Sequence, residues 1–274
     1  MNLQPSTAVM KSKKIGIIGC GNLGSSILNG LIANENISNN NIVATRTNLQ
    51  VIDCYKDAGV HLTSDNAQAV KESEILIVAL KPFKILSVLD SLKTIIDPKK
   101  HIVVSLATGI SIQDIENVLG QSTPIFRAMP NTAAEVGMSM TCLCSNTVNE
   151  GHNDLIKGIF DSIGATLCIK EDMMDSATVL GASGIAFVLR FMRAMTQGGV
   201  QVGFDAKTAN QIVQQTVKGA AELLIASQAH PESEIDKVTT PNGCTIAGLN
   251  EMEHNGLSSA VIMGIISSLE QIKK

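Results

Sequence analysis

The sequence has very few aromatic side chains and a slight excess of negative charge. Its 274 residues include no Trp, 1 Tyr and 6 Phe, and the formal net charge is −4. Proteins that hold single-stranded nucleic acid stack the bases on aromatic rings, and binding to a phosphate backbone needs an excess of Lys and Arg. We therefore expect no nucleic-acid partner.

The chain also lacks the long apolar runs of membrane and secreted proteins. No run approaches the roughly 18–20 apolar residues that cross a membrane. Residues 1–13 are polar and contain no apolar stretch of signal-peptide length. We expect residues 1–13 to be a disordered lead-in, and the protein to be soluble, cytoplasmic and without a membrane partner.

The cysteines follow no pattern typical of a metal or redox site. They stand at positions 20, 54, 142, 144, 168 and 244. None forms Cys-x-x-Cys, and the Cys142-x-Cys144 pair has no second pair or His-x-His motif to complete a zinc site. We expect free thiols in a reducing compartment and no bound metal.

A glycine-rich motif follows the first expected strand, Ile15–Ile18. Residues 19–24 have the pattern G-x-G-x-x-G, and apolar residues then recur at helical spacing. A strand, a glycine turn and a helix in succession are the context in which this motif binds a dinucleotide rather than forming an ordinary turn. The three glycines would make the turn, admit the pyrophosphate and let the helix pack on the strand. The residues expected at the phosphates are Gly19, Gly21, Asn22, Leu23 and Gly24.

The end of the second expected strand, near residue 46, indicates which dinucleotide is bound. NAD-preferring folds place an Asp or Glu about 20 residues after the glycines, where it bonds the ribose 2′-hydroxyl. This chain has Thr45, Arg46 and Thr47 there, without a carboxylate. Arg pairs with phosphate through parallel charged hydrogen bonds. This favours a role for Arg46 in binding the 2′-phosphate of NADP(H) over the alternative that it is an ordinary surface residue at a strand end. We expect NADPH as the cofactor, with NADH as the alternative.

Strands and helices alternate through the first 170 residues. Further apolar segments typical of strands occur near 59–63, 74–80, 101–107, 124–130, 137–143 and 165–169. This alternation predicts an α/β Rossmann domain, with a doubly wound, mainly parallel sheet, over residues 14–170. Ligands bind such sheets beyond the carboxyl ends of the strands. The further cofactor residues expected at these ends are Ala79, Leu80, Lys81, Pro82, Ala107, Met129 and Asn131.

The pattern changes near residue 171. No clear strand follows, and helical periodicity covers 173–202, 206–228, a segment ending near 253, and 257–272. Three or four helices with so much Met, Ile, Val and Ala would bury their apolar faces poorly alone. Exchange of helices with a second copy would cover these faces, so we expect residues 171–274 to form an all-helical dimerisation domain.

Two segments are candidates for the chemistry, and neither contains histidine. Lys81 directly follows the fourth strand, where it would either face a substrate or hold strand-end carbonyls, and the residues alone favour neither role. The polar Thr239–Thr245 segment precedes a helix, where hydroxyls and backbone N–H groups can trap a carboxylate. An ordinary helix cap accounts for the same residue types, and on the residues alone it is the favoured interpretation.

Several motifs together resemble the pyrroline-5-carboxylate reductase family. They are residues 19–24, Ala79-Leu-Lys-Pro82, Met129-Pro-Asn-Thr132, Gly198-Gly-Val200 and Val238-Thr-Thr-Pro-Asn-Gly-Cys-Thr-Ile-Ala-Gly-Leu249. The likeness extends from about residue 14 to the end of the sequence. It implies a Rossmann domain and a helical domain that intertwines in a homodimer, in some members within a decameric ring of dimers. It also implies NAD(P)H-dependent reduction of 1-pyrroline-5-carboxylate, a cyclic imine, to L-proline, the last step of proline biosynthesis.

The resemblance also implies roles for individual residues. Arg46 and Asn66 match positions near the adenosine 2′-phosphate, and Leu80, Lys81 and Ala107 match positions that line the cofactor cleft. Thr245 matches the hydroxyl beside the imine nitrogen, and we take Thr245 and Lys81 as the catalytic residues. A protonated imine is already electrophilic, so the reaction needs placement more than an acid. The residues implied to hold the substrate are Thr239, Thr240, Asn242, Gly243, Cys244 and Thr245.

The chain departs from the family's usual pattern in two places. Where the family commonly has Ser-Gly-Pro-Ala-Tyr, this chain has Ser183-Gly-Ile-Ala-Phe187. Ile185 and Phe187 thus replace a Pro and a Tyr, which removes a rigid turn and a phenol. Where the family commonly has Pro-Gly-Gly, this chain has Pro241-Asn242-Gly243, so Asn242 replaces the first glycine. Asn tolerates a positive φ better than most residues do.

Two other activities fit the expected architecture. β-Hydroxyacid dehydrogenases share it, but their usual Asn and Lys at the start of the second domain are absent from Gly181–Arg193. A non-catalytic NADP-binding paralogue is the other alternative, and the two departures are its only support.

Overall fold

The computed structural model describes residues 7–34 and 37–273, and it divides the chain into two compact units. The first extends to Ser183, and the second comprises Gly184–Gln271. The first unit thus continues beyond residue 171, where the sequence pattern changes.

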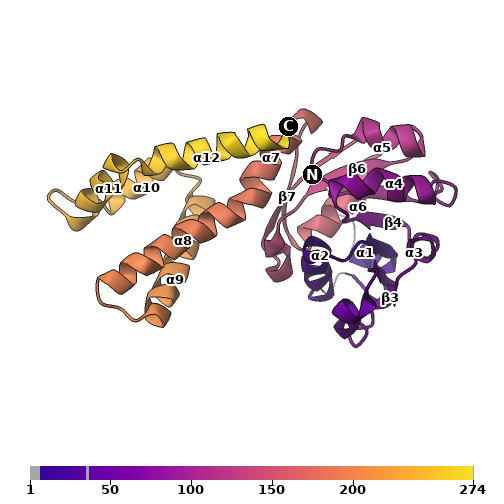
Figure 1. The fold of residues 1–274 in the computed structure, drawn as a ribbon, viewed down its shortest axis with the longest axis horizontal. Helices are drawn as coiled ribbons and strands as arrows, with labels where there is room; N and C mark the ends of the chain where they lie inside the picture. Colours follow the sequence, from indigo (N-terminus) through magenta and orange to yellow (C-terminus); the bar gives the residue numbers. More distant parts are fainter. Residues whose placement is uncertain (1–6, 35–36, 274) are drawn as a thin grey trace. The chain divides into compact units, whose positions relative to one another are not determined.

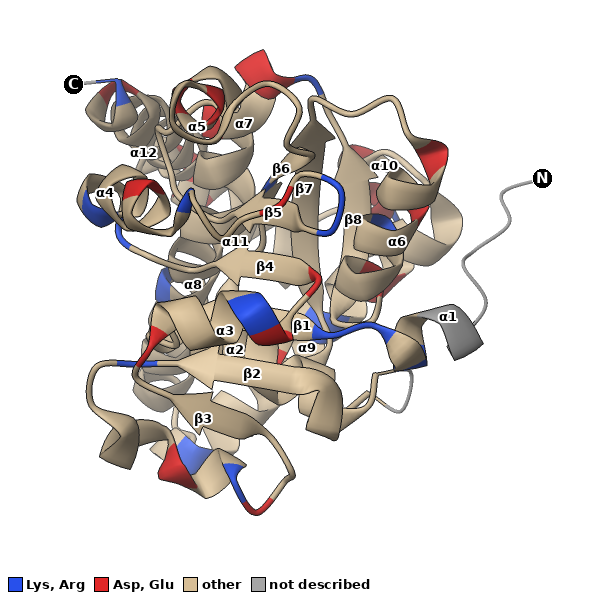
Figure 2. Ribbon diagram, turned by 90° about the vertical axis from the view of Figure 1, so that its right-hand side faces the viewer, with Lys and Arg blue, Asp and Glu red and all other residues tan. Residues whose placement is uncertain are grey.

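One sheet organises the first unit (Figure 1). Its strands are β1 (Ile15–Ile18), β2 (Ile42–Thr45), β3 (His61–Thr63), β4 (Ile75–Val78), β5 (Ile102–Ser105), β6 (Ile125–Met129), β7 (Ser139–Ser145) and β8 (Gly164–Cys168). They lie in the order β3-β2-β1-β4-β5-β6-β7-β8, and all neighbours are parallel except β6 and β7. Figure 2 shows the first five of these strands one above another. The predicted doubly wound, mainly parallel sheet is confirmed.

Helices cover both faces of this sheet. Ile17 packs into one apolar cluster with helices α2 (Asn22–Ile32) and α6 (Glu150–Asp161). The next residue, Ile18, packs into a second cluster with α3 (Asn66–Glu72), α4 (Pro82–Leu92) and α5 (Ile112–Leu119). Because successive side chains of a strand point to opposite faces and both faces are buried, the central strands are mostly apolar, with Thr45, Ser105 and Arg127 as buried polar exceptions. The 3₁₀ helices that precede β7 are η1 (Asn39–Asn41), η2 (Leu49–Tyr55) and η3 (Thr132–Val136).

Part of the expected lead-in is helical. Helix α1 (Thr7–Ser12) occupies residues for which the sequence predicts disorder, so that prediction is wrong there, and residues 1–6 lie outside the described residues. Met10 is buried in the same cluster as Ile17, and Asn41 Nδ2 donates a hydrogen bond of 2.8 Å to the backbone oxygen of Lys11. These two contacts hold α1 to the rest of the unit.

The segment between residues 171 and 183 packs on the sheet, which explains why the first unit includes it. Glu171 forms an ion pair of 3.0 Å with the buried Arg127 of β6. Met174 is fully buried, and Asn131 Nδ2 donates a hydrogen bond of 3.0 Å to the backbone oxygen of Gly181. The segment contains η4 (Glu171–Met173), α7 (Met174–Ala177) and the π-helix η5 (Thr178–Ser183).

The second unit is entirely helical in its described residues, as expected. Its helices are α8 (Gly184–Gln201), α9 (Ala206–Ser227), α10 (Pro231–Lys237), α11 (Cys244–His254) and α12 (Leu257–Ile272). The sequence analysis did not anticipate α10. That helix is short and mostly polar, so it has no apolar periodicity, and Pro231 at its first turn is its main sequence signal.

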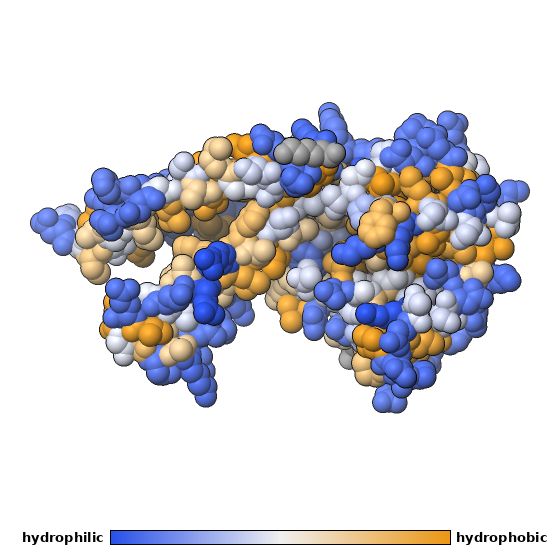
Figure 3. Space-filling model, in the orientation of Figure 1, coloured by the Kyte–Doolittle hydropathy of each residue, from blue (hydrophilic) through white to orange (hydrophobic). Residues whose placement is uncertain are grey.

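The second unit buries few apolar side chains within one chain. Among its described residues, Ala209 and Val213 are the buried hydrophobic ones. Figure 3 shows apolar side chains, in orange, at the surface of the face drawn. The large hydrophobic residues exposed in this unit are Val188, Leu189, Phe191, Val200, Val202, Phe204, Ile212, Leu223, Ile225, Val238, Met252, Val261, Ile262, Met263 and Ile266.

One helical stretch, Glu171–Gln201, meets the length and composition criterion for crossing a membrane. An 18-residue window within it has a mean hydropathy of 1.3, and 11% of the window is buried. The prediction concerned unbroken apolar runs, so it does not cover this stretch, which meets the criterion by its average alone. No unbroken apolar run exists there, but Ala, Val, Leu, Ile, Phe and Met, with few charged residues among them, raise the average. The same exposed surface suits packing against a second copy of the chain.

Candidate functional site

A cleft of about 590 Å³ opens at the carboxyl ends of the central strands of the first unit. It lies where the strand order reverses, between β1 with β2 on one side and β4 with β5 on the other, which is where open α/β sheets bind ligands. The predicted cofactor residues that line it are Gly19, Gly21, Asn22, Leu23, Arg46, Thr47, Ala79, Leu80, Lys81, Pro82 and Ala107.

The three glycines of the turn after β1 have different structural tasks. Gly19 has a φ of +92°, which glycine adopts without strain. A Cβ atom on Gly24 would lie 2.8 Å from the backbone oxygen of Gly19, so this glycine lets α2 pack against the turn. A Cβ atom on Gly21 would meet nothing within 4 Å, because that position faces the open cleft. The turn thus leaves one backbone position free for a ligand to approach.

Helix α2 presents unpartnered backbone donors at this turn. Gly21 is its N-cap and contributes no side-chain hydrogen bond, while its carbonyl accepts from the backbone N–H of Ser25 at 2.8 Å. The backbone N–H groups of Asn22, Leu23 and Gly24 have no acceptor among the described residues. The first turn of a helix with free N–H groups and the positive end of the helix dipole attracts anions. This end of the cleft is therefore suited to a pyrophosphate.

Thr45 fixes the turn from the neighbouring strand. Its side chain is 2% exposed, and its Oγ1 accepts a hydrogen bond of 3.1 Å from the backbone N–H of Gly19. The same hydroxyl donates to Asn66 Oδ1 at 2.7 Å. Because the amide oxygen of Asn66 is occupied in this way, its NH2 group remains as a donor. Thr45 and Asn66 thus stand behind the lining residues of the cleft.

The wall of the cleft carries positive charge and no carboxylate. Arg46 Nη1 donates a hydrogen bond of 2.7 Å to the backbone oxygen of Cys20, which places the guanidinium beside the glycine turn. Lys81 is exposed at the N-cap of α4, and its ammonium forms no hydrogen bond or ion pair within the described part of the chain. Lys84, one turn further along, also lines the cleft. Three cations without an acidic neighbour in the lining favour a ligand with several phosphates.

Besides Gly24, Thr45 and Asn66, two predicted cofactor residues lie away from this lining. Met129 is 4% exposed and packs with Cys142 and Met174. Asn131 is 5% exposed, and its side chain accepts from the backbone N–H of Ala133 at 3.0 Å in addition to its bond to Gly181. Met129 ends β6 and Asn131 follows that strand, but β7 and the segment after residue 171 cover both residues.

The sequence analysis missed some residues of the lining. Cys20 lies inside the glycine motif, so the motif itself could have indicated it, and Leu106 and Thr108 flank the predicted Ala107. Thr132 directly follows the predicted Asn131, whereas Lys84 reaches the cleft from the first turn of α4, which strand-end reasoning does not detect. No histidine belongs to the lining, and the described residues contain no group of His, Cys, Asp and Glu suited to a metal ion.

The predicted substrate segment, Thr239–Thr245, forms a tight turn in the second unit. The backbone N–H of Gly243 donates to the oxygen of Thr240 at 3.0 Å, with Pro241 second and Asn242 third in the turn. Asn242 has a φ of +58°, as a type II turn requires at its third position. The Asn that replaces glycine is therefore accommodated in the conformation expected for glycine.

This turn leads directly into α11. The N-cap of α11 is Gly243, and within the described residues no side chain caps this end. Thr239 is committed elsewhere, because its Oγ1 donates to the backbone oxygen of Ile235 at 2.7 Å. Cys244 is exposed and Thr245 is half-buried at the first turn of the helix. The segment thus offers free backbone donors and a hydroxyl, which together suit a small carboxylate.

Comparisons with known proteins find relatives for both parts of the chain. The family described as pyrroline-5-carboxylate reductase dimerisation matches residues 171–274, and that described as NADP oxidoreductase coenzyme F420-dependent matches residues 14–109. Pyrroline-5-carboxylate reductase 2 of Dictyostelium discoideum is 41% identical over 98% of this chain and 95% of its own length. Pyrroline-5-carboxylate reductase 1 of the same organism is 44% identical over 94% of this chain, which spans 49% of that relative's length. The crystal structure of Plasmodium falciparum pyrroline carboxylate reductase with NADP bound has a TM-score of 0.88 and 28% identity, covering 96% of this chain and 98% of that one.

Replacement of Gly21 by Ala tests the open position in the glycine turn. The new methyl group has space in the protein itself, so we expect an unchanged melting temperature. It occupies the place where a pyrophosphate approaches the backbone, so NADPH should bind at least about tenfold more weakly in a fluorescence titration. Gly24→Ala is the control, because its methyl group clashes inside the protein and should lower the melting temperature. Unchanged NADPH affinity in Gly21→Ala would contradict this placement of the phosphates.

Proposed function

Because this chain belongs to the pyrroline-5-carboxylate reductase family, we propose that it reduces 1-pyrroline-5-carboxylate to L-proline with NADPH, the last step of proline biosynthesis. It is an oxidoreductase that acts on a CH–NH group. The observation that carries this proposal is the pairing of an open, cationic dinucleotide cleft with a relative that is 41% identical along nearly the whole chain.

The cofactor is held by the first unit. When bound, NADPH supplies the hydride that the imine carbon receives. The free N–H groups at the start of α2 and the open position at Gly21 receive the pyrophosphate. Arg46, Thr47 and the free NH2 group of Asn66 receive the 2′-phosphate, since no carboxylate stands there to repel it. The same site admits NADH with fewer contacts.

The substrate is held by the Thr239–Thr245 segment. Backbone donors at the start of α11 bind its carboxylate, and the hydroxyl of Thr245 stands beside the ring nitrogen. A protonated imine is electrophilic without further activation, so placement of the ring is the main task of the protein, and no histidine is needed. Lys81, whose ammonium has no partner among the described residues, contributes positive charge at the cleft and assists catalysis there.

The chain has a dimerisation domain and forms a homo-oligomer. We assign residues 14–170 to the Rossmann domain and residues 171–274 to the dimerisation and substrate domain, with a homodimer as the unit and a decameric ring of dimers as the larger alternative. A second copy covers the exposed apolar side chains of α8 and α12, including the apolar part of Glu171–Gln201. The protein is then soluble, and we place it in the cytoplasm without a nucleic-acid or membrane partner.

Substrate choice is tested by NADPH oxidation with 1-pyrroline-5-carboxylate and with a panel of β-keto acids. We expect turnover with the imine and none with the keto acids. Turnover with the keto acids alone would indicate a β-hydroxyacid dehydrogenase. NADPH binding without any turnover would indicate a non-catalytic paralogue.

The role of Arg46 is tested by its replacement with Gln. We expect the Kd for NADPH to rise at least about tenfold and the Kd for NADH to change little, because NADH lacks the 2′-phosphate with which the guanidinium pairs. Lys93→Gln, which removes an exposed cation of the same unit outside the cleft, is the control and should change neither Kd. Equal losses for NADPH and NADH in Arg46→Gln would contradict the assignment.

The role of Thr245 is tested by its replacement with Ala. The loss of the hydroxyl should lower kcat with 1-pyrroline-5-carboxylate at least about tenfold and leave the Kd for NADPH unchanged. Ser233→Ala, which removes an exposed hydroxyl from the neighbouring α10, should leave both quantities unchanged. If Thr245→Ala weakens NADPH binding as much as turnover, Thr245 does not belong to the substrate site.

A further inference from the structure

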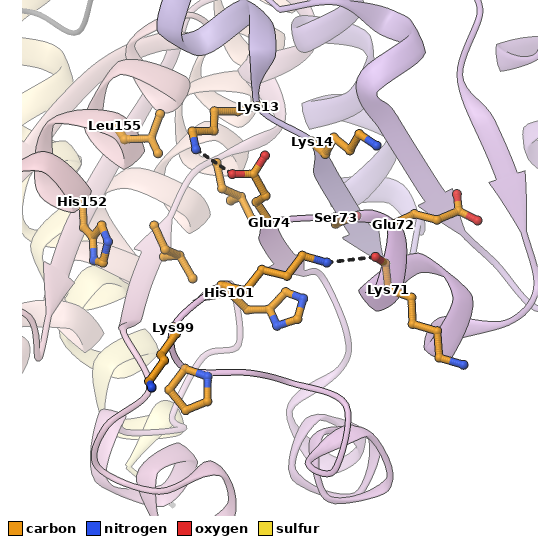
Figure 4. A pocket seen from close by; sticks show the side chains of 14 residues that line it. Lys13, Lys14, Lys71, Glu72, Ser73, Glu74, Lys99, His101, His152 and Leu155 are labelled. Atoms are coloured by element: carbon orange, nitrogen blue, oxygen red, sulfur yellow. Dashed lines mark hydrogen bonds and ion pairs between the residues drawn. The ribbon is translucent and has the colours of Figure 1, made fainter.

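A second cavity, of about 540 Å³, lies in the first unit at the opposite edge of the sheet from the cofactor cleft (Figure 4). The segments that enter β1, β4 and β5 form it together with the start of α6. Lys14 precedes β1, Glu74 precedes β4 and His101 precedes β5, so these are the amino ends of the strands. The cofactor cleft lies at their carboxyl ends, and the two cavities share no lining residue.

The lining of this cavity has more positive than negative side chains, with five lysines and two glutamates. Both glutamates have partners. Glu74 forms an ion pair of 2.6 Å with Lys13. Glu72 accepts from Gln68 Nε2 at 2.9 Å and contacts His61 Nδ1 at 2.6 Å, and these hydrogen bonds, with the charge of Lys14, lower the pKa of its carboxyl group. The carboxylates therefore leave an excess of positive charge in the cavity.

Three lysines supply this excess. The ammonium groups of Lys14, Lys71 and Lys99 form no hydrogen bond or ion pair with the residues that the structure describes, whereas Lys100 Nζ donates to the backbone oxygen of Lys71 at 3.0 Å. Figure 4 places Lys99 on one side of the hollow, and Lys14 and Lys71 on the other. An anion between them would have cations on both sides.

The two histidines of the lining differ in how their ring nitrogens are hydrogen-bonded. His101 is buried; its Nδ1 accepts from the backbone N–H of Asp97 at 2.8 Å and its Nε2 faces the oxygen of Val70 at 3.2 Å, which is the pattern of a neutral ring. Nδ1 of His152 is buried and has no hydrogen-bond partner among the described residues. Polar atoms in such surroundings are nearly always paired, so an unpaired ring nitrogen in the wall of a cationic cavity points to a missing ligand or water.

We infer that this cavity binds a small multivalent phosphate anion. Lysine ammonium groups are compact point charges that suit phosphate, and rotation of the His152 ring, whose Nδ1 is buried here, would let that atom donate to the anion. The site is separate from the catalytic cleft, so the inference does not depend on the proposed function. A bound phosphate there would bridge the entrances of β1, β4 and β5.

The inference is tested by calorimetric titration of pyrophosphate, in phosphate-free buffer, into the full-length protein saturated with NADPH. Saturation with NADPH fills the catalytic cleft, so remaining binding reports another site. We expect one saturable site per chain. In the double variant Lys14→Gln/Lys99→Gln, the Kd for pyrophosphate should rise at least about tenfold.

A matched control has the same loss of charge outside the cavity. Lys56→Gln/Lys93→Gln removes two exposed lysines that do not line it, and the Kd for pyrophosphate should stay within about twofold of the wild-type value. His152→Leu should also weaken binding, with melting temperature and NADPH affinity as checks that all variants fold. No saturable binding to the wild-type protein, or equal weakening in the two lysine pairs, would overturn the inference.

Discussion

The cofactor site depends on one constraint, which is that the start of α2 must meet the end of β1 at the point where the sheet reverses direction. A positive φ at Gly19 and the missing side chain of Gly24 make this meeting sterically possible. Thr45 then fixes the turn from the next strand through the N–H of Gly19. The outcome is a set of backbone donors that the protein itself does not satisfy, and an anionic ligand is their natural acceptor.

The helical second unit depends on a different constraint, the burial of apolar surface. Its helices expose many large hydrophobic side chains and bury very few within one chain. A partner subunit is therefore needed before these helices have a core of ordinary size. The same unit carries the Thr239–Thr245 segment, so the proposed assembly and the proposed substrate site rest on the same helices. Loss of the dimer should therefore lower the activity of the enzyme as well as its stability.

Much of this arrangement was predictable because the determining signals are local. The central strands are mostly apolar because both faces of the sheet are buried, and the glycine spacing identifies the turn. The positive φ of Asn242 was predictable because this residue stands where the family has a glycine. By contrast, α10 has no apolar periodicity, and α1 is held by Met10 and by a contact from a distant loop. The burial of Met129 depends on an antiparallel partner strand and on a segment beyond residue 171, which a local pattern does not reveal.

The central claim is that a dinucleotide bound at the start of α2 meets a small carboxylate bound at the start of α11. A crystal structure of the protein with NADPH and L-proline tests it most directly. The account predicts the pyrophosphate beside Gly21 and the proline carboxylate at the Thr239–Thr245 segment, with the proline ring against the nicotinamide. A structure in which that segment lies far from the nicotinamide, both in its own subunit and in the neighbouring one, would contradict the account.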